Sequence, residues 1–198
     1  PVAATDLPQG RPLLVFIHGT ASRTISSFGA LANPDAGLHW RVLRESFGEH
    51  IYAFEHRTMS DSPIDNAIAL LEALPVAAEV HLVTHSRGGL VGDLLCLTEL
   101  SDTQIRSYRR RDAGQEEADA YDRKQLNRLR DLLGQKQLRV ARYARVACPA
   151  RGTLLASDNI DEFLSILTNL IGLIPGLGAS PIYQVVKRVT LEVVRQRM

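Results

Sequence analysis

The sequence predicts an α/β fold, a three-layer structure in which a parallel sheet carries helices on both faces. Residues 13–17 form a continuous apolar run, which is typical of a strand buried on both faces of a parallel sheet. From residue 13 to residue 95, such runs alternate with segments whose apolar residues follow helical spacing. The length of 198 residues fits one domain with a sizeable core.

The composition is that of an ordinary globular protein. Hydrophobic residues make up 45% and charged residues 23%, and the formal net charge is +1, so we expect no nucleic acid partner. The two cysteines, Cys96 and Cys148, match no metal-ligand spacing, and we expect neither a metal nor another cofactor. We interpret them as buried thiols of a reducing compartment, with a single disulfide as the alternative.

The amino end shows no basic region followed by an apolar one, so no signal peptide is visible. This favours a cytoplasmic location. The chain begins with proline, however, and a processed terminus would have lost such a signal without trace. The sequence leaves the oligomeric state open.

The first part of the chain predicts a linker and a central strand. Residues 1–11 are rich in Pro, Ala and Gly and predict a lead-in linker, and residues 12–198 predict a single domain. The strand at residues 13–17 ends in a loop, residues 18–22, where glycine allows backbone N–H groups to face a ligand. We expect residues 22–38 to form a loop because they are rich in Ser, Gly, Asn and Pro.

Two helices and a short strand follow. Apolar residues at helical spacing predict a helix over residues 39–47, and Gly48 ends it. Residues 51–54 predict the next strand. The following helix begins with Ser62 as its cap, proline at its first position and Asp65 in its first turn.

Residues 80–91, VHLVTHSRGGLV, have the pattern of a nucleophile elbow. An apolar strand ends at Ser86, and a segment with helical spacing follows after two glycines. We expect a strained backbone at Ser86, with Gly88 letting the strand and the helix approach closely. Thr84 stands where the G-x-S-x-G pattern has its first glycine, and a plain strand-to-helix loop is the alternative interpretation.

The remainder of the chain predicts mostly helices. Residues 101–139 mix acidic and basic residues and predict an exposed, salt-bridged helical insertion, with a cap over the site as the alternative. A fourth strand is expected near residues 142–147. Residues 157–198 predict apolar terminal helices, in which the apolar stretch of residues 160–174 is too short to span a bilayer. That stretch is either a buried helix or a lid, and it allows transient contact with a membrane surface.

Polar residues end three of the predicted strands. His18, His56 and Ser86 each stand at the carboxyl end of a strand, where parallel sheets bind ligands. We therefore expect these residues to share one edge of the sheet.

Three motifs in this order resemble those of the α/β-hydrolase superfamily, within it the lipase and esterase branch. They are VFIHGT at residues 15–20, THSRGG at residues 84–89 and CPARGT at residues 148–153, so the resemblance covers residues 13 to about 153. It implies a serine hydrolase that cleaves a small-molecule or lipid ester. Ser86 would attack the acyl carbon, and the oxyanion hole would use the backbone N–H groups of Arg87 and of Thr20 or Ala21.

The chain departs from this family in one respect. The family places its acid and its histidine after the serine, whereas all six histidines here lie before Ser86. Three hypotheses explain this departure. In the first, the chain is the amino-terminal part of a longer hydrolase, and in the second, His56 is a local base. In the third, the fold is kept as a catalytically incomplete module with a binding, membrane-surface or structural role.

Overall fold

The computed structural model describes residues 7–32, 38–110 and 116–148. The chain divides into two compact units, Pro1–Ala150 and Arg151–Met198. All described residues belong to the first unit, so the predicted turn at residues 149–153 and the predicted helices of residues 157–198 lie outside them.

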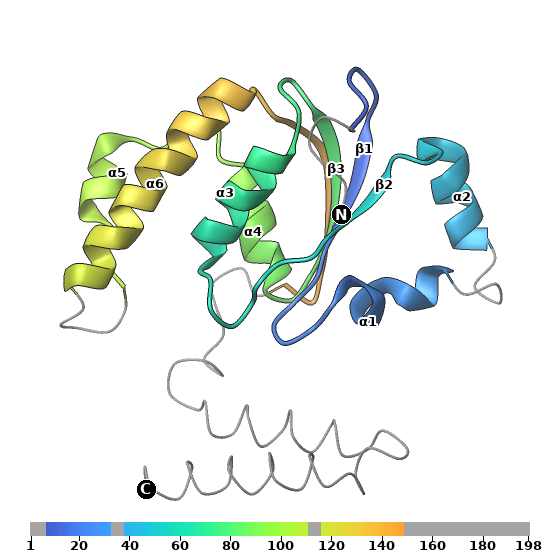
Figure 1. Cartoon of the computed structure of the whole chain (residues 1–198), viewed down its shortest axis with the longest axis horizontal. Helices are drawn as coiled ribbons and strands as arrows, with labels where there is room; N and C mark the ends of the chain where they lie inside the picture. Colours follow the sequence, from blue (N-terminus) through green and yellow to red (C-terminus); the bar gives the residue numbers. More distant parts are fainter. Residues whose placement is uncertain (1–6, 33–37, 111–115, 149–198) are drawn as a thin grey trace, which may run out of the picture. The chain divides into compact units, whose positions relative to one another are not determined.

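The first unit is built on a four-stranded sheet with the order β2-β1-β3-β4, and every neighbouring pair is parallel (Figure 1). The strands are β1 (Leu13–Ile17), β2 (Ile51–Phe54), β3 (Glu79–His85) and β4 (Arg139–Val146). The predicted parallel α/β sheet is confirmed. Strand β4 begins at Arg139, three residues before the expected start, and its register against β3 shifts between Val80 and His81.

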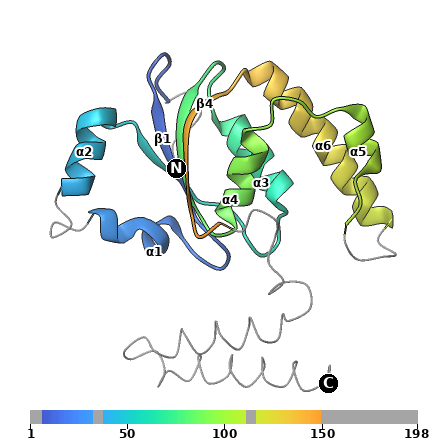
Figure 2. The ribbon, with the colours of Figure 1, turned by 180° about the vertical axis from the view of Figure 1, so that it is seen from behind.

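Helices lie on both sides of the sheet, as Figures 1 and 2 show from opposite directions. One side carries α1 (Thr24–Phe28), the 3-10 helix η2 (Gly29–Ala32) and α2 (Leu38–Phe47). The other side carries α3 (Pro63–Ala73) and α4 (Gly88–Leu95). Beyond α3 lie α5 (Asp102–Ser107) and α6 (Glu116–Lys136), of which α6 packs against α3.

The start of α3 follows from its sequence. The Ser62 hydroxyl accepts the Asp65 N–H at 3.1 Å, and the Asp65 carboxylate accepts the Ser62 N–H at 3.2 Å, which completes a capping box. Pro63 occupies the first helical position, where no N–H is needed. The cap fixes the exit of the loop that connects β2 to α3.

The core lies between the sheet and the helices α3, α4 and α6. Its members are apolar and almost free of solvent contact, among them Leu13, Ile17, Leu71, Val80, Leu82, Val91 and Leu129. Each such side chain contributes about 1.5–3 kcal/mol relative to an exposed one. The core therefore holds β1 and β3, the two central strands, in fixed register.

The expected loop over residues 22–38 is wrong in part, because α1 and η2 occupy residues 24–32. Helix α1 has no side-chain cap. Tertiary contacts hold it instead: the Thr24 N–H donates to Glu55 Oε1 at 2.8 Å, and the Phe28 ring packs on Phe16 with 4.9 Å between centroids. These contacts come from outside residues 22–38, so the local sequence does not predict them.

The charged insertion is helical as expected, but two of its charges are buried. Asp119 and Asp122 on α6 are 7% and 3% exposed, where the sequence suggested solvated faces. The Arg110 guanidinium donates to both carboxylate oxygens of Asp122, at 2.7 and 2.8 Å, and this pairing compensates the burial. None of the described helices is both long and apolar enough to cross a bilayer.

Candidate functional site

The carboxyl ends of β1, β2 and β3 meet at one edge of the sheet. Ile17 pairs with Phe54 on one side and with Thr84 on the other, so the three strands end level with one another. The segments that follow them, residues 18–21, 55–62 and 86–88, lie side by side at this edge. The structure thus brings the loops that carry His18, His56 and Ser86 to one edge.

Ser86 sits at a sharp turn between β3 and α4. Its φ of 52° lies in the left-handed region, which is costly for a residue with a β-carbon, at about 1–3 kcal/mol. Backbone bonds hold the turn: the Ser86 N–H donates to Val146 O at 3.0 Å, and the Ser86 carbonyl accepts the Gly89 N–H at 3.0 Å. Ser86 itself is partly exposed. This is the strained strand-to-helix turn expected of a nucleophile elbow.

Two glycines permit this turn. A β-carbon on Gly19 would stand 2.7 Å from the β-carbon of Ser86, and one on Gly88 would stand 2.5 Å from the Ile17 carbonyl oxygen and 2.6 Å from that of His18. All three distances are too short for any side chain. The end of β1 and the start of α4 therefore touch through bare backbone, and the loop after β1 lies against the serine.

The position of Thr84 is compatible with the turn. Its side chain is fully buried, and its hydroxyl lies 3.3 Å from Cys148 Sγ. The residue that has no room for a side chain here is Gly89, because an added β-carbon would lie 2.5 Å from the β-carbon of Cys148.

The three amides expected in an oxyanion hole differ in their bonding. Among the described residues, neither the Thr20 N–H nor the Arg87 N–H donates to any group. The Arg87 amide precedes α4 directly, where helix dipole and unpaired N–H groups favour negative charge. The Ala21 N–H, in contrast, donates to the Thr58 hydroxyl at 2.9 Å. Thr20 and Arg87 are thus the amides with free donors.

His18 is a buried structural group, 1% exposed. Its Nε2 accepts the His56 N–H at 3.3 Å, so its Nδ1 carries the proton and donates to Gly19 O at 3.0 Å. Glu55 Oε2 lies 3.5 Å from the same Nε2 and gains no hydrogen bond in this tautomer. Both ring nitrogens of His18 thus serve to shape the loops after β1 and β2.

His56 lies in a stack of rings. Its imidazole stacks on His18 with 4.2 Å between centroids and on Phe54 with 5.1 Å. Burial lowers the pKa of His56 to about 4. Within the described ranges, its buried Nε2 has no partner and no hydrogen bond joins its ring to Ser86.

The Arg87 side chain links the elbow to the loop after β2. Its Nη2 donates to the Asp61 carbonyl at 2.6 Å, while the buried Nη1 has no partner in the described part of the chain. Burial lowers the pKa of this guanidinium. Thr58 and Asp61 were not foreseen: topology predicts that their loop reaches this edge, but no motif marks the residues that make the contacts.

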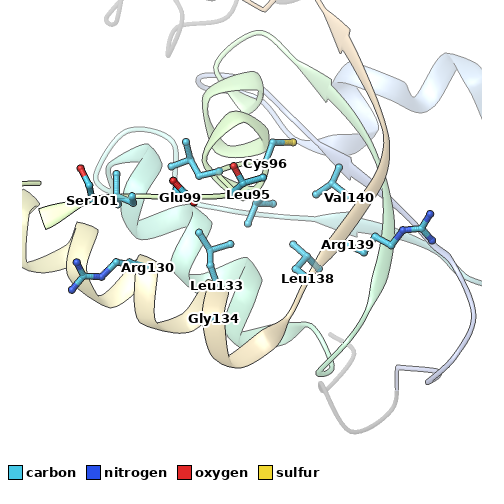
Figure 3. Close-up of a pocket in the computed structure, with 13 residues that line it drawn as sticks. Leu95, Cys96, Glu99, Ser101, Arg130, Leu133, Gly134, Leu138, Arg139 and Val140 are labelled. Atoms are coloured by element: carbon cyan, nitrogen blue, oxygen red, sulfur yellow. The ribbon is translucent and has the colours of Figure 1, made fainter. Parts of the chain in front are cut away.

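A pocket of about 790 Å³ lies away from Ser86, near the amino end of β4 (Figure 3). Leu95, Leu133, Leu138 and Val140 gather between α4, α6 and β4, whereas Arg130 and Arg139 extend away. Cys96, at this pocket, is exposed and Cys148 half-buried, and both thiols are free. The expectation of buried cysteines is wrong for Cys96 because it follows the last turn of α4 at the surface.

No cluster of metal-ligating side chains occurs within residues 7–32, 38–110 and 116–148. At this edge, the His18 and His56 rings belong to the ring stack and the Arg87 side chain is tied to Asp61. The buried Nδ1 of His85, the residue before Ser86, has no partner in the described part of the chain. The chemistry that this edge can offer is a hydroxyl on a strained turn beside unpaired amides.

Comparison with curated proteins and with solved structures gave no match. A family model described as "Domain of unknown function (DUF7379)" matches residues 1–111. The matched stretch includes β1, β2, β3 and the turn at Ser86, and it ends before α6 and β4. Because the match covers more than half of the chain, this protein belongs to the DUF7379 family.

Proposed function

We propose that this protein is an α/β-hydrolase-like serine hydrolase of the esterase or lipase type, with Ser86 as its nucleophile. One observation carries the proposal: Ser86 has a φ of 52° at the turn from β3 to α4, with Gly19 of the loop after β1 directly against it. Strain of this kind persists where a structure needs it, and nucleophile elbows expose their serine in this way.

In the proposed reaction, Ser86 Oγ attacks the acyl carbon of an ester and gives its proton to a base. The carbonyl π electrons move to the oxygen, and the amides of Arg87 and Thr20 donate to the resulting oxyanion. Loss of one such donor typically lowers the rate by about 100- to 1,000-fold. Collapse of the intermediate breaks the ester bond, the alcohol leaves with the proton, and water then hydrolyses the acyl-serine.

The base is the part that the described residues do not supply. No histidine follows Ser86 in the sequence, and a pKa of about 4 makes His56 a weak base at neutral pH. We therefore place the histidine and the acid in protein sequence beyond residue 198, with this chain as the amino-terminal part of a longer hydrolase. The substrate would be a small-molecule or lipid ester.

The test is covalent labelling with a fluorophosphonate, applied to the full-length protein and to the 198-residue chain. We expect labelling of the full-length protein and its loss in Ser86→Ala. Ser46→Ala is the matched control, because Ser46 is exposed on α2 and its hydroxyl only donates to Val42 O. Labelling that persists in Ser86→Ala rules out Ser86 as the nucleophile.

A second candidate is a catalytically incomplete module that binds a partner, a membrane surface or another part of a larger protein. It is favoured by the absence of a hydrogen bond between Ser86 Oγ and any histidine in the described ranges. This candidate predicts no labelling of either chain by the fluorophosphonate. If the full-length protein is folded but stays unlabelled, the result supports this second candidate.

A further inference from the structure

We infer that Thr58 is a positioning residue, which holds the Ala21 amide away from the reaction so that Thr20 and Arg87 supply the two oxyanion donors. The inference rests on the proposed function. It starts from the hydrogen bond that the Ala21 N–H donates to Thr58 Oγ1 at 2.9 Å, across 37 residues of sequence.

The loop after β1 needs such a restraint. Ala21 has a φ of 49°, a left-handed conformation that alanine rarely adopts. Gly19 lies against Ser86, and the Thr20 N–H belongs to the peptide that directly follows Gly19. The Ala21 N–H belongs to the next peptide along. Because these two peptide units meet at the Thr20 α-carbon, holding the Ala21 amide restricts the orientation of the unit that carries the Thr20 N–H.

Thr58 is able to act as a fixed point because the two residues before it are anchored, one to the ring that follows β1 and the other to α3. Before it, the His56 N–H donates to the buried His18 ring at 3.3 Å. Next to it, the carbonyl of Arg57 accepts the side-chain amide of Asn66 at 3.1 Å, and Asn66 is 2% exposed within α3. The loop thus takes its position from β1 and from α3.

The same loop also holds the other donor. The Arg87 guanidinium donates to the Asp61 carbonyl at 2.6 Å, four residues before Asp65 closes the cap of α3. The residue that carries the second oxyanion amide is therefore tied to the segment that carries Thr58. Residues 55–62 form a common support for both halves of the proposed oxyanion hole.

The test compares Thr58→Val, which keeps the shape and loses the hydroxyl, with Thr58→Ser, which keeps the hydroxyl, in the full-length protein. We expect the fluorophosphonate labelling rate and kcat for an ester to fall about 10- to 100-fold in Thr58→Val, with KM little changed. Thr58→Ser should stay within about threefold of the unmodified protein. Thr98→Val is the control, because Thr98 is exposed at the distant pocket.

Equal labelling rates in Thr58→Val and the unmodified protein overturn the inference and leave the proposed function standing. The same holds if Thr58→Ser is as slow as Thr58→Val. An unmodified protein that is folded but not labelled overturns the proposed function, and the inference with it. Amide hydrogen exchange gives a readout without activity: the Ala21 N–H should lose protection in Thr58→Val and keep it in Thr58→Ser.

Discussion

Gly19 and Ser86 are packed so closely that a β-carbon on the glycine would lie 2.7 Å from the β-carbon of the serine. This contact joins the loop after β1 to the turn after β3. It makes Gly19 of the VFIHGT motif a steric requirement of the candidate site.

Replacement of Gly19 should therefore disable the site. In Gly19→Ala the new methyl group forces either the Thr20 peptide or Ser86 to move, and neither change preserves the proposed alignment. We expect the fluorophosphonate labelling rate to fall at least about 10-fold. A variant that is labelled at the rate of the unmodified protein would show that the contact has no role in reactivity.

Gly88→Ala should reduce stability, because the methyl group would meet the carbonyl oxygens of Ile17 and His18 at 2.5 and 2.6 Å. Overpacking against backbone costs about 1–3 kcal/mol in free energy of unfolding. Gly134→Ala is the matched control: Gly134 lies in α6 with nothing within 4 Å, so the change should stabilise by about 0.5–1 kcal/mol. Urea denaturation measures the free energy of unfolding of both variants. A loss of stability in Gly134→Ala but not in Gly88→Ala would contradict this account of the turn.

Stability should depend on pH through His56. Burial lowers its pKa from 6.5 to about 4, so the unfolded chain binds more protons than the folded one between these values. The free energy of unfolding should therefore fall as the pH drops from about 6.5 towards 4. His56→Gln should make this fall smaller, whereas His39→Gln, at an exposed position on α2, should leave it unchanged. Urea midpoints at pH 7 and pH 4.5 test this, and identical falls in all three proteins would refute it.

Asp122 should be the most sensitive charge of the α6 helix. Its carboxylate accepts both Arg110 bonds and the Tyr108 hydroxyl at 3.2 Å, and the residue is 3% exposed. Asp122→Ala removes these hydrogen bonds to a charged group, while the Arg110 side chain can turn to water, and we expect a loss of about 1.5–3 kcal/mol in free energy of unfolding.

Glu72→Ala is the control for that change. Glu72 pairs with Arg128 at the surface, where ion pairs contribute less than about 1 kcal/mol. Thermal or urea denaturation compares the two variants. Equal losses would mean that burial does not set the strength of the Asp122 pair.

Sequence patterns predicted the structural elements that are determined by residues close together in the sequence. The apolar run of β1, the Ser62 capping box and the glycine stop at Gly48, with its φ of 60°, each follow from residues within a few positions of one another. The turn at Ser86 belongs to this class as well, since strand, serine and glycines are adjacent. Parallel topology then places the loops of His18, His56 and Ser86 at one edge.

The features that were missed depend on residues distant in sequence. Helix α1 is held by Glu55 and Phe16, and the Ala21 amide is occupied by Thr58. Burial lowers the pKa of His56, and the His18 ring that stacks on it comes from 38 residues earlier in the sequence. Periodicity and propensity describe neighbours along the chain, so they carry no information about such partners.

The position of β1 has a consequence for biosynthesis. This strand is synthesised before the other three described strands, yet it takes a central position in the sheet, between neighbours that begin at Ile51 and Glu79. While a ribosome translates the intervening residues, the five apolar side chains of Leu13–Ile17 have no partner strand to cover them. Pairings over such sequence separations form slowly and expose nascent chains to aggregation. Production of this protein should therefore respond to translation speed and to chaperones that shield this strand.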